Sequence, residues 1–451
     1  MRKLSVLLVA VMLISCLSGL SALAEENPPI TIEYWNINNE SFGGPANAVM
    51  IEKFNQTNDK NITVVDVHYS DYMAVAQSLQ ASLAAGEYPG VVQVGYSTLN
   101  YFAENFPQFT DPTTIISEYC PEDADYLDSK YAPSVQSLGI AANGRMLGMP
   151  YAFSVPLLFY NADLFREAGL DPDDPPTTWE EAYEMGKVIR EKTGKPALFI
   201  QTPADTYSII PIFMSAGVDN MYVANEGGGY HTTFNTEESV YAWQLIQDMT
   251  RDGVNVYMTH EEGTGAYVGQ QVAMYLTTSA RASYMANNTD FDSRAALQPT
   301  FEGNELKVSI GGNMLVTVAR SDAQVKACWE FIKFLLEPEQ VDTWVRGTGY
   351  LPPTKDAADD ETDPLYPYFA EAPMLQLALT EQAYASPWTS WPGMNGLMVD
   401  QYLIDLRDRI TTSSYEDVAS VISETASIID SLIQSESTRL RVPAQNARDP
   451  S

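Results

Sequence analysis

The sequence contains few of the residues on which disulfide frameworks, metal sites and nucleophilic catalysis are built. Its 451 residues include three cysteines and three histidines. Two cysteines, Cys120 and Cys328, follow the N-terminal segment, and two are too few for a disulfide framework. The histidines, His68, His231 and His260, lie far apart in sequence, and no Gly-x-Ser-x-Gly motif accompanies them. The sequence therefore gives no indication of a catalytic triad.

Motifs for metals, nucleotides and other cofactors are missing as well. His260 and Glu261 begin like the motif of a zinc protease, but Thr264 stands where the second histidine is required. The sequence contains neither a Walker phosphate-binding loop nor the Gly-x-Gly-x-x-Gly fingerprint of dinucleotide-binding proteins. We therefore expect no metal and no cofactor.

Positive charge is scarce. Against 59 Asp and Glu stand 25 Lys and Arg, which gives a formal net charge of −34 at pH 7. Nucleic acids and anionic membrane surfaces both require clustered cations, so we expect the protein to bind neither. Hydrophobic residues make up 45% of the chain, which is enough to bury a large core, so the sequence predicts a globular protein rather than an acidic disordered one.

Long apolar runs are confined to the N-terminus. Two basic residues precede the apolar segment 4–20, and Ala22 and Ala24 supply the small residues of a cleavage site. We interpret residues 1–24 as a signal peptide and expect an exported protein. Lipidation of Cys16, which ends a lipobox-like stretch, is the alternative; cleavage after Ala24 is favoured because the residues after Cys16 are still apolar. Apolar stretches after the signal peptide are too short to span a bilayer.

Strand and helix patterns alternate in the N-terminal part of the mature chain. Residues 30–35 and 62–68 are rich in β-branched and aromatic residues and predict strands. Residues 46–55 and 72–85 have helical spacing, and residues 91–94 form a further short apolar strand. This β-α-β-α-β order is typical of an α/β layer with a largely parallel sheet.

Two later helices have clear start signals. Thr178 and Glu181 form a capping box ahead of an apolar helical face, and Gly194 ends that helix. Ser321, with Gln324 three residues further on, begins another helix. Because the sequence has no low-complexity linker, its folding units must be joined by short crossings.

Aromatic residues in polar, loop-like surroundings are the unusual feature of this chain. Residues 387–393 (PWTSWPG) cannot form a regular helix, and Trp388 and Trp391 would be costly to expose. The tyrosines in similar surroundings are Tyr72, Tyr96, Tyr207 and Tyr350. Aromatic faces pack on the C–H groups of a sugar ring, while neighbouring hydroxyls and amides bind its hydroxyls. The pattern favours a carbohydrate site, with an ordinary core position as the alternative for each ring.

Four separated segments share an order and spacing known from one family. They are residues 79–93 (LQASLAAGEYPGVVQ), 148–181 with the run FYNADLFREAGLDP, 273–279 and 311–352. Together they resemble extracellular solute-binding protein family 1, the carbohydrate- and glycerol-3-phosphate-type binding proteins of bacterial ABC importers. The four segments cover nearly all of the mature chain.

The resemblance implies an α/β fold of the periplasmic-binding-protein type (type II), with two α/β lobes and a ligand cleft between them. By analogy, the first lobe comprises residues 28–152 plus 311–348. The second lobe comprises residues 153–310 plus 349–451. Crossings between the lobes are expected near residues 152–154, 309–312 and 347–350. Ligands of such sheets gather at the carboxyl ends of the strands.

The resemblance also implies positions in the cleft, some near the matching residue rather than at it. With the aromatic residues above, the candidate ligand-binding residues are Asn38, Asn39, Tyr72, Tyr96, Ser154, Tyr207, Thr278, Ser279, Arg281, Gly312, Asn313, Tyr350, Trp388 and Trp391. Glycerophosphate-binding members place a carboxylate about where Tyr96 stands and an arginine about where Trp391 stands. A phosphate prefers a bidentate guanidinium, whereas an aromatic ring suits a neutral sugar. Arg281 remains a cation for the cleft, which keeps a uronic or phosphorylated sugar as an alternative.

The sequence thus predicts an exported, monomeric, non-enzymatic receptor of the periplasm or the extracellular face of the membrane. It would capture a neutral sugar or oligosaccharide by closure of two lobes and deliver it to the permease subunits of an ABC importer. One alternative is a binding protein for glycerol 3-phosphate, a glycerophosphodiester or a sugar phosphate, and another is a receptor that serves a membrane sensor kinase. The rival class is a glycan-cleaving enzyme, because such an enzyme needs two carboxylates across a cleft and the chain is rich in acids.

Overall fold

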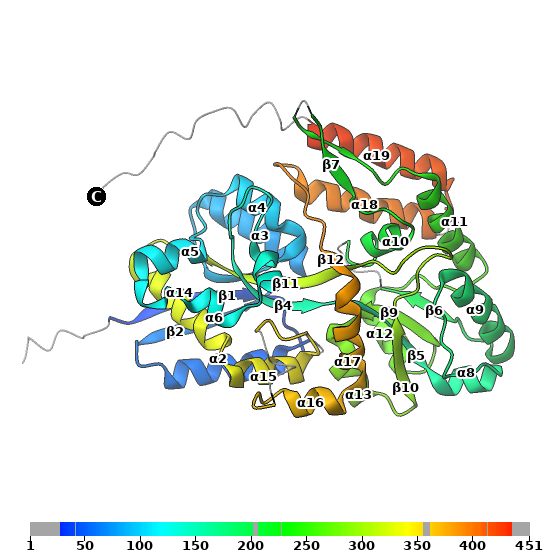
Figure 1. Ribbon diagram of the computed structural model, residues 1–451, viewed down its shortest axis with the longest axis horizontal. Coiled ribbons are helices and arrows are strands. Elements are labelled where there is room, and N and C mark those ends of the chain that lie inside the picture. The colour runs from blue at the N-terminus through cyan, green and yellow to red at the C-terminus, as the bar shows by residue number, and fades with distance from the viewer. Residues whose placement is uncertain are drawn as a thin grey trace, which may run out of the picture.

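The computed structural model describes residues 28–40, 42–201, 206–226, 228–354, 361–412 and 414–434. The expected signal peptide, residues 1–24 with Cys16, lies outside the described residues. Among the helices of the described part, none combines the length and the apolar character needed to cross a membrane. Figure 1 shows two bodies side by side, each with its own sheet and covering helices. We call the body with the first sheet lobe 1 and the other lobe 2.

Lobe 1 is built on a six-stranded sheet. Its strands are β1 (Ile30–Asn36), β2 (Ile62–His68), β3 (Gly90–Gly95), β4 (Met149–Ser154), β11 (Val308–Val318) and β12 (Ala385–Pro387). The order is β12-β11-β3-β1-β2, and β4 pairs with β11. Because β1 pairs in parallel with both β2 and β3, the N-terminal α/β layer predicted from the sequence is confirmed.

The helices of lobe 1 connect and cover these strands. They are α2 (Gly44–Thr57), α3 (Tyr72–Ala85), α4 (Leu99–Asn105), α5 (Pro112–Thr114), α6 (Tyr126–Lys130), α7 (Pro133–Gln136), α14 (Asp322–Leu335) and α15 (Pro338–Thr348). α3 begins because the Asp71 carboxylate caps it, accepting a 2.8 Å hydrogen bond from the Ala74 N–H. It ends at Gly86, whose φ of 75° suits a residue without a side chain. The predicted helix start at Ser321 is confirmed at α14.

Lobe 2 contains a four-stranded sheet in the order β10-β5-β9-β6. Its strands are β5 (Pro156–Asn161), β6 (Leu198–Ile200), β9 (Met274–Thr278) and β10 (Ser293–Leu297), with a separate hairpin of β7 (Tyr222–Ala224) and β8 (Tyr230–Thr232). Its helices are α8 (Ala162–Ala168), α9 (Trp179–Thr193), α10 (Ile210–Ser215), α11 (Glu237–Arg251), α12 (His260–Val268), α13 (Ala282–Asn288), α16 (Tyr366–Glu371), α17 (Pro373–Glu381), α18 (Gly396–Thr411) and α19 (Val418–Gln434). The capping box of Thr178 and Glu181 at the start of α9 is confirmed.

The segments that connect the two sheets lie next to one another. β4 ends at Ser154 in the first sheet and β5 begins at Pro156 in the second, while Gly311 of β11 pairs with Ser154. The Leu351 N–H donates a 2.9 Å hydrogen bond to the Phe153 carbonyl, which brings a third segment to the same place. Figure 1 shows β4 and β11 extending from the first sheet into the middle of the molecule, toward lobe 2.

Both cysteines of the described chain are buried and free. Cys328 lies on the buried face of α14, and burial raises the pKa of its thiol. These thiols therefore behave as small hydrophobic side chains.

Candidate ligand-binding site

A cavity of about 440 Å³ lies beside the connecting segments and receives side chains from both lobes. This volume falls in the range of small-molecule sites. Lobe 1 contributes Ile37, Asn39, Phe42, Ser70, Asp71 and Tyr72. The connecting segments contribute Ser154, Gly312, Tyr350 and Trp388. Lobe 2 contributes Gln201, Tyr207, Thr259, His260, Glu261, Thr278 and Arg281.

The cavity brings together most of the residues proposed from the sequence. Those in its lining are Asn39, Tyr72, Ser154, Tyr207, Thr278, Arg281, Gly312, Tyr350 and Trp388. The lining does not include Asn38, Tyr96, Ser279, Asn313 or Trp391. Contacts of these five residues with a ligand stay predictions.

The residues outside the lining support the wall from behind or pack elsewhere. The Asn313 amide donates a 2.8 Å hydrogen bond to the Tyr72 hydroxyl, and the Ser279 hydroxyl accepts one of 3.2 Å from the Val155 N–H. Trp391 is fully buried, and its ring centroid lies 5.1 Å from that of Tyr222. The two tryptophans of the 387–393 loop therefore have different surroundings.

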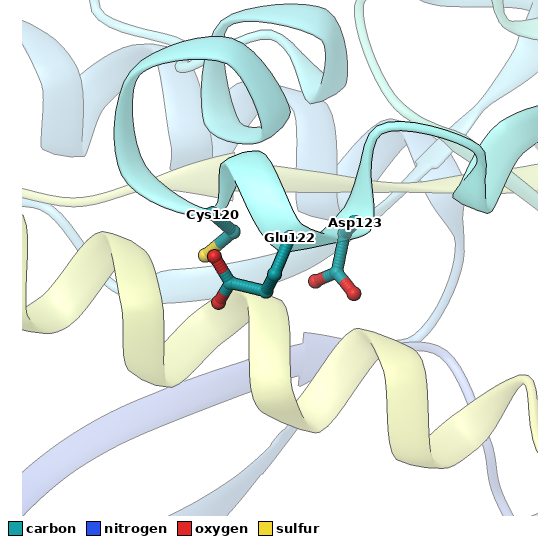
Figure 2. Close-up of side chains that lie close together, drawn as sticks. All are labelled: Cys120, Glu122 and Asp123. Carbon is teal, nitrogen blue, oxygen red and sulfur yellow. The ribbon is translucent and has the colours of Figure 1, made fainter.

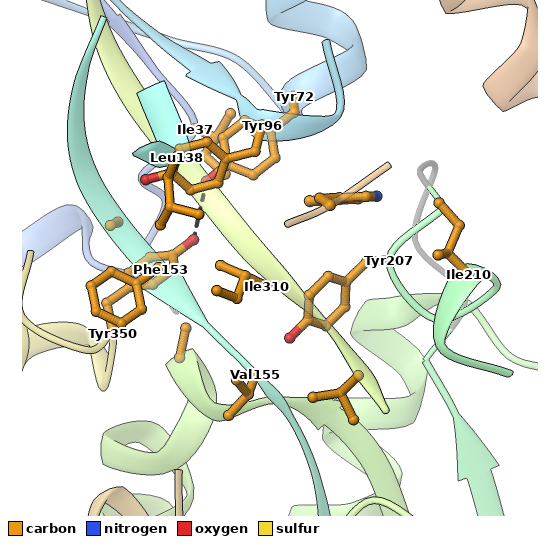
Figure 3. Packing of buried hydrophobic residues seen from close by; sticks show 14 of the residues in the cluster. Ile37, Tyr72, Tyr96, Leu138, Phe153, Val155, Tyr207, Ile210, Ile310 and Tyr350 are labelled. Carbon is orange, nitrogen blue, oxygen red and sulfur yellow. Dashed lines mark hydrogen bonds between the residues drawn. The ribbon is translucent and has the colours of Figure 1, made fainter. Parts of the chain in front are cut away.

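Tyr72 and Tyr350 form one side of the wall. Their hydroxyl oxygens are 3.1 Å apart, a contact drawn as the dashed line in Figure 3. The Tyr350 ring stacks on Trp344 with centroids 5.7 Å apart and planes at 12°, and Trp344 stacks on Tyr151. Burial raises the pKa of Tyr350 well above its ordinary value, so its hydroxyl keeps its proton and can donate to a ligand.

Tyr207 and Trp388 form a second aromatic corner. Their rings meet edge to face, with centroids 5.4 Å apart, and the Trp388 indole N–H donates a 3.2 Å hydrogen bond to the Thr206 hydroxyl. The Tyr207 ring lies so close to β11 that a Cβ on Gly311 would be 2.1 Å from a ring carbon. Glycine at position 311 therefore lets the Tyr207 ring lie against the strand, and Figure 3 shows Tyr207 in the same cluster as Tyr72 and Tyr350.

The charged residues of the wall come mainly from lobe 2. Arg281 is buried, and its guanidinium carbon lies 4.8 Å from the centroid of the Phe42 ring in lobe 1. The guanidinium contacts Nε2 of His260. Burial, and then the charge of Arg281, lower the pKa of His260 to about 3, so the imidazole is neutral at neutral pH. Asp71 and Glu261 add two carboxylates to the wall.

Several wall residues were not proposed from the sequence. Asp71 could have been found, because an aspartate directly before a helix is a typical N-cap and lies at the carboxyl end of a strand in this topology. In the sequence, His260 and Glu261 form only an incomplete zinc motif, which does not indicate a place in a ligand-binding wall. Phe42 and Gln201 carry no local signal, because each joins the cavity through tertiary packing.

A separate group of possible metal ligands lies in lobe 1, away from the cavity. Figure 2 shows Cys120, Glu122 and Asp123, whose ligand atoms lie within 4.8 Å of one another. Asp123 already accepts hydrogen bonds of 2.7 Å from the Trp329 indole and 2.9 Å from the Lys333 ammonium group. Burial, and then Glu122, raise the pKa of the Cys120 thiol, whereas a metal requires the thiolate. The hydrogen bonds from Trp329 and Lys333 to Asp123 hold the loop that contains Asp123 against α14.

Comparison with known proteins identifies the family. Residues 49–371 match the family described as bacterial extracellular solute-binding protein. The chain belongs to this solute-binding family. Members bind small-molecule ligands and work with ABC permease subunits, so the predicted function as a solute-binding protein of ABC importers is confirmed. 

Relatives of this solute-binding protein cover most of its length. The sn-glycerol-3-phosphate-binding periplasmic protein UgpB of Pectobacterium atrosepticum is 26% identical over 343 residues, which cover 72% of this chain and 74% of the relative. Maltose-bound MalE3 of T. maritima has a TM-score of 0.75 at 21% identity, covering 89% of this chain and all of that one. UgpB of Mycobacterium tuberculosis in complex with glycerophosphocholine has a TM-score of 0.73 at 21% identity, covering 90% and 98%. The predicted two-lobed α/β fold is confirmed by these structures.

Proposed function

We propose that this solute-binding protein captures a neutral sugar or oligosaccharide between its lobes and delivers it to a permease. The observation that carries the proposal is the composition of the cavity wall. Aromatic rings of Tyr72, Tyr207 and Trp388 alternate there with hydroxyl and amide groups of Asn39, Ser154, Gln201 and Thr278. Rings supply stacking area for the C–H faces of a sugar, and the polar groups pair with its hydroxyls.

The charge of the wall supports a neutral ligand. Among the described residues of the wall, Arg281 is the one cation, and the same wall carries the carboxylates of Asp71 and Glu261. A phosphate dianion entering this cavity would meet two like charges, whereas sugar hydroxyls donate hydrogen bonds to carboxylates. The distribution therefore favours hydroxyl-rich ligands over phosphates.

In this proposal two lobes close around the sugar. The bounds expected from the resemblance are residues 28–152 plus 311–348 and residues 153–310 plus 349–451, except that β12 (Ala385–Pro387) pairs with β11 and belongs to the sheet of lobe 1. Ligand that contacts both walls stabilises the closed arrangement, and this difference in contacts drives closure. The protein binds the sugar without breaking a bond, so the sugar is recovered unchanged.

The remaining parts of the proposal concern the mature protein. Residues 1–24 direct export, and cleavage after Ala24 is favoured over a lipid anchor at Cys16. The mass of the mature protein distinguishes the two, because lipidation adds acyl chains to a chain that begins at Cys16. We also propose a monomer, which light scattering after size-exclusion chromatography tests.

Calorimetric titration with a ligand panel tests the proposed ligand class. The panel contains maltose, maltotriose, glucuronate, glycerol 3-phosphate and glycerophosphocholine. We expect binding of a neutral sugar, and we expect Trp388→Ala to weaken it roughly 5- to 150-fold, since a central aromatic contact contributes about 1 to 3 kcal/mol. Tyr241→Ala is the control, because Tyr241 is 53% exposed on α11 and does not line the cavity. Equal effects of both substitutions, or no binding of neutral sugars, would contradict the proposal.

A glycerophosphodiester with a cationic head group is the second candidate ligand. Arg281 offers a guanidinium for the phosphate, while aromatic rings beside Asp71 and Glu261 suit a quaternary ammonium. Binding of glycerophosphocholine without binding of neutral sugars would favour this candidate. Loss of that binding in Arg281→Gln would place the phosphate at the guanidinium.

A further inference from the structure

Arg281 and His260 meet in the cavity wall although they come from different elements of lobe 2. His260 is the first residue of α12, directly after the cap residue Thr259. Arg281 ends the short 3₁₀ helix Ser279–Arg281 that follows β9. Their side chains are in contact through the guanidinium Nη2 and the imidazole Nε2, and both residues line the cavity.

The direction of this hydrogen bond follows from the chemistry of the two groups. A guanidinium only donates, so Nε2 of His260 must accept and cannot carry a proton. Burial and the neighbouring positive charge keep the imidazole neutral, which places its single proton on Nδ1. Nδ1 lies 3.2 Å from the Tyr275 hydroxyl, which in turn lies 3.2 Å from the Thr264 hydroxyl. Arg281 at Nε2 and Tyr275 at Nδ1, both from lobe 2, thus fix the orientation of the imidazole.

The guanidinium is also constrained from the opposite lobe. The Phe42 ring covers one face of Arg281, with the guanidinium carbon 4.8 Å from the ring centroid. The charged or titratable neighbours of Arg281 are Tyr275, Tyr350, Tyr284, Glu261 and His260. A guanidinium whose face is covered interacts through its N–H edges, which donate parallel hydrogen bonds to adjacent oxygens.

We propose that His260 is a positioning residue that holds Arg281 through its unprotonated Nε2, so that Arg281 determines ligand specificity by donating to adjacent oxygens of the sugar. This inference rests on the proposed sugar-binding function for its ligand, but the positioning itself is a property of the ligand-free protein. The two N–H groups on one edge of a guanidinium can donate to two adjacent oxygens, and a pyranose carries such pairs of oxygens on neighbouring ring carbons. Deoxy sugars that lack one of the two oxygens leave a donor unpaired and are rejected.

The positioning is tested first without ligand. Long-range ¹H–¹⁵N NMR spectra report which imidazole nitrogen carries the proton, and the chain has three histidines, so His260→Gln identifies the resonances. We expect the Nδ1–H form with unprotonated Nε2 for His260 between pH 5 and 8. Protonation of Nε2 at His260 in this range would overturn the inference, whatever the ligand is.

Affinity measurements test the consequence for the ligand, with maltotriose as the probe. His260→Gln places an amide oxygen near the position of Nε2 and is expected to retain affinity within about threefold. His260→Phe removes the acceptor and is expected to weaken binding roughly tenfold or more, the effect typical of a lost hydrogen bond to a charged group. His231→Gln is the control, because His231 is exposed on β8 and outside the lining. Equal binding by His260→Phe and the wild type would contradict the positioning.

Failure of the inference and failure of the proposed function give different results. If maltotriose and the other neutral sugars do not bind at all while the imidazole has the expected tautomer, the sugar-binding proposal fails and the positioning of Arg281 stands. If neutral sugars bind but Arg281→Gln leaves their affinity unchanged, Arg281 does not determine specificity. Melting temperatures of the variants are measured alongside, so that loss of folding is recognised.

Discussion

Replacement of Gly311 by alanine should damage the binding site without changing any group that contacts the ligand directly. A Cβ at this position would lie 2.1 Å from the ring of Tyr207, whereas carbon atoms in contact are normally about 3.5 to 4.0 Å apart. β11 pairs with β4 at Ser154. Because the strand is held in the sheet, we expect the Tyr207 ring to move rather than the backbone.

The magnitude follows from the contacts that Tyr207 would lose. Its edge-to-face contact with Trp388 contributes about 0.5 to 1.5 kcal/mol, and a hydrogen bond from its hydroxyl to a ligand contributes about the same. Loss of both corresponds to about 1 to 3 kcal/mol, or roughly 5- to 150-fold weaker sugar binding. Calorimetric titration with maltotriose measures this change directly.

A matched substitution and a double variant serve as controls. Gly265→Ala also replaces a glycine, but a Cβ there would meet no atom within 4 Å, so we expect unchanged affinity. Gly311→Ala combined with Tyr207→Ala should bind no worse than Tyr207→Ala alone, because the clash is gone. Wild-type affinity in Gly311→Ala, or additive losses in the double variant, would refute the reasoning.

Two further predictions concern stability. Burial raises the pKa of Glu381 to about 8, so the folded state keeps a proton that the unfolded state releases above about pH 4.5. The free energy of unfolding should therefore fall by up to about 4 to 5 kcal/mol as pH rises from about 4.5 to 8. In urea unfolding series, Glu381→Gln should remove most of this pH dependence. A pH profile of Glu381→Gln equal to that of the wild type would contradict a buried neutral Glu381. Thr178→Ala removes the cap of α9 and should lower the free energy of unfolding by about 1 kcal/mol. The affinity for the sugar should stay the same. A stability equal to that of the wild type would show that the cap contributes little.

Local sequence signals were sufficient for the N-terminal α/β layer and for two later helices. The β-α-β-α-β order, the cap at Thr178 and the helix end at Gly194 depend on residues within one turn or strand of each other, and the structure confirms them. The resemblance to a known family supplied the two-lobed arrangement, which no local pattern contains.

The site could be predicted only in part, because its wall forms by tertiary packing. Trp388 and Trp391 stand three residues apart in the same loop, yet one lines the cavity and the other packs against Tyr222. That difference depends on the path of a non-helical loop, which sequence spacing does not determine. The contact of Arg281 with His260 likewise depends on how the segment after β9 and the first turn of α12 come together.

A competition titration tests the central claim most directly. The mature protein is titrated with maltotriose, with glycerophosphocholine and with maltotriose in the presence of glycerophosphocholine, and the sugar is analysed afterwards by chromatography. The account predicts that maltotriose binds, that glycerophosphocholine does not displace it, and that the sugar is recovered intact. Binding of glycerophosphocholine alone, or cleavage of the sugar, would contradict the account.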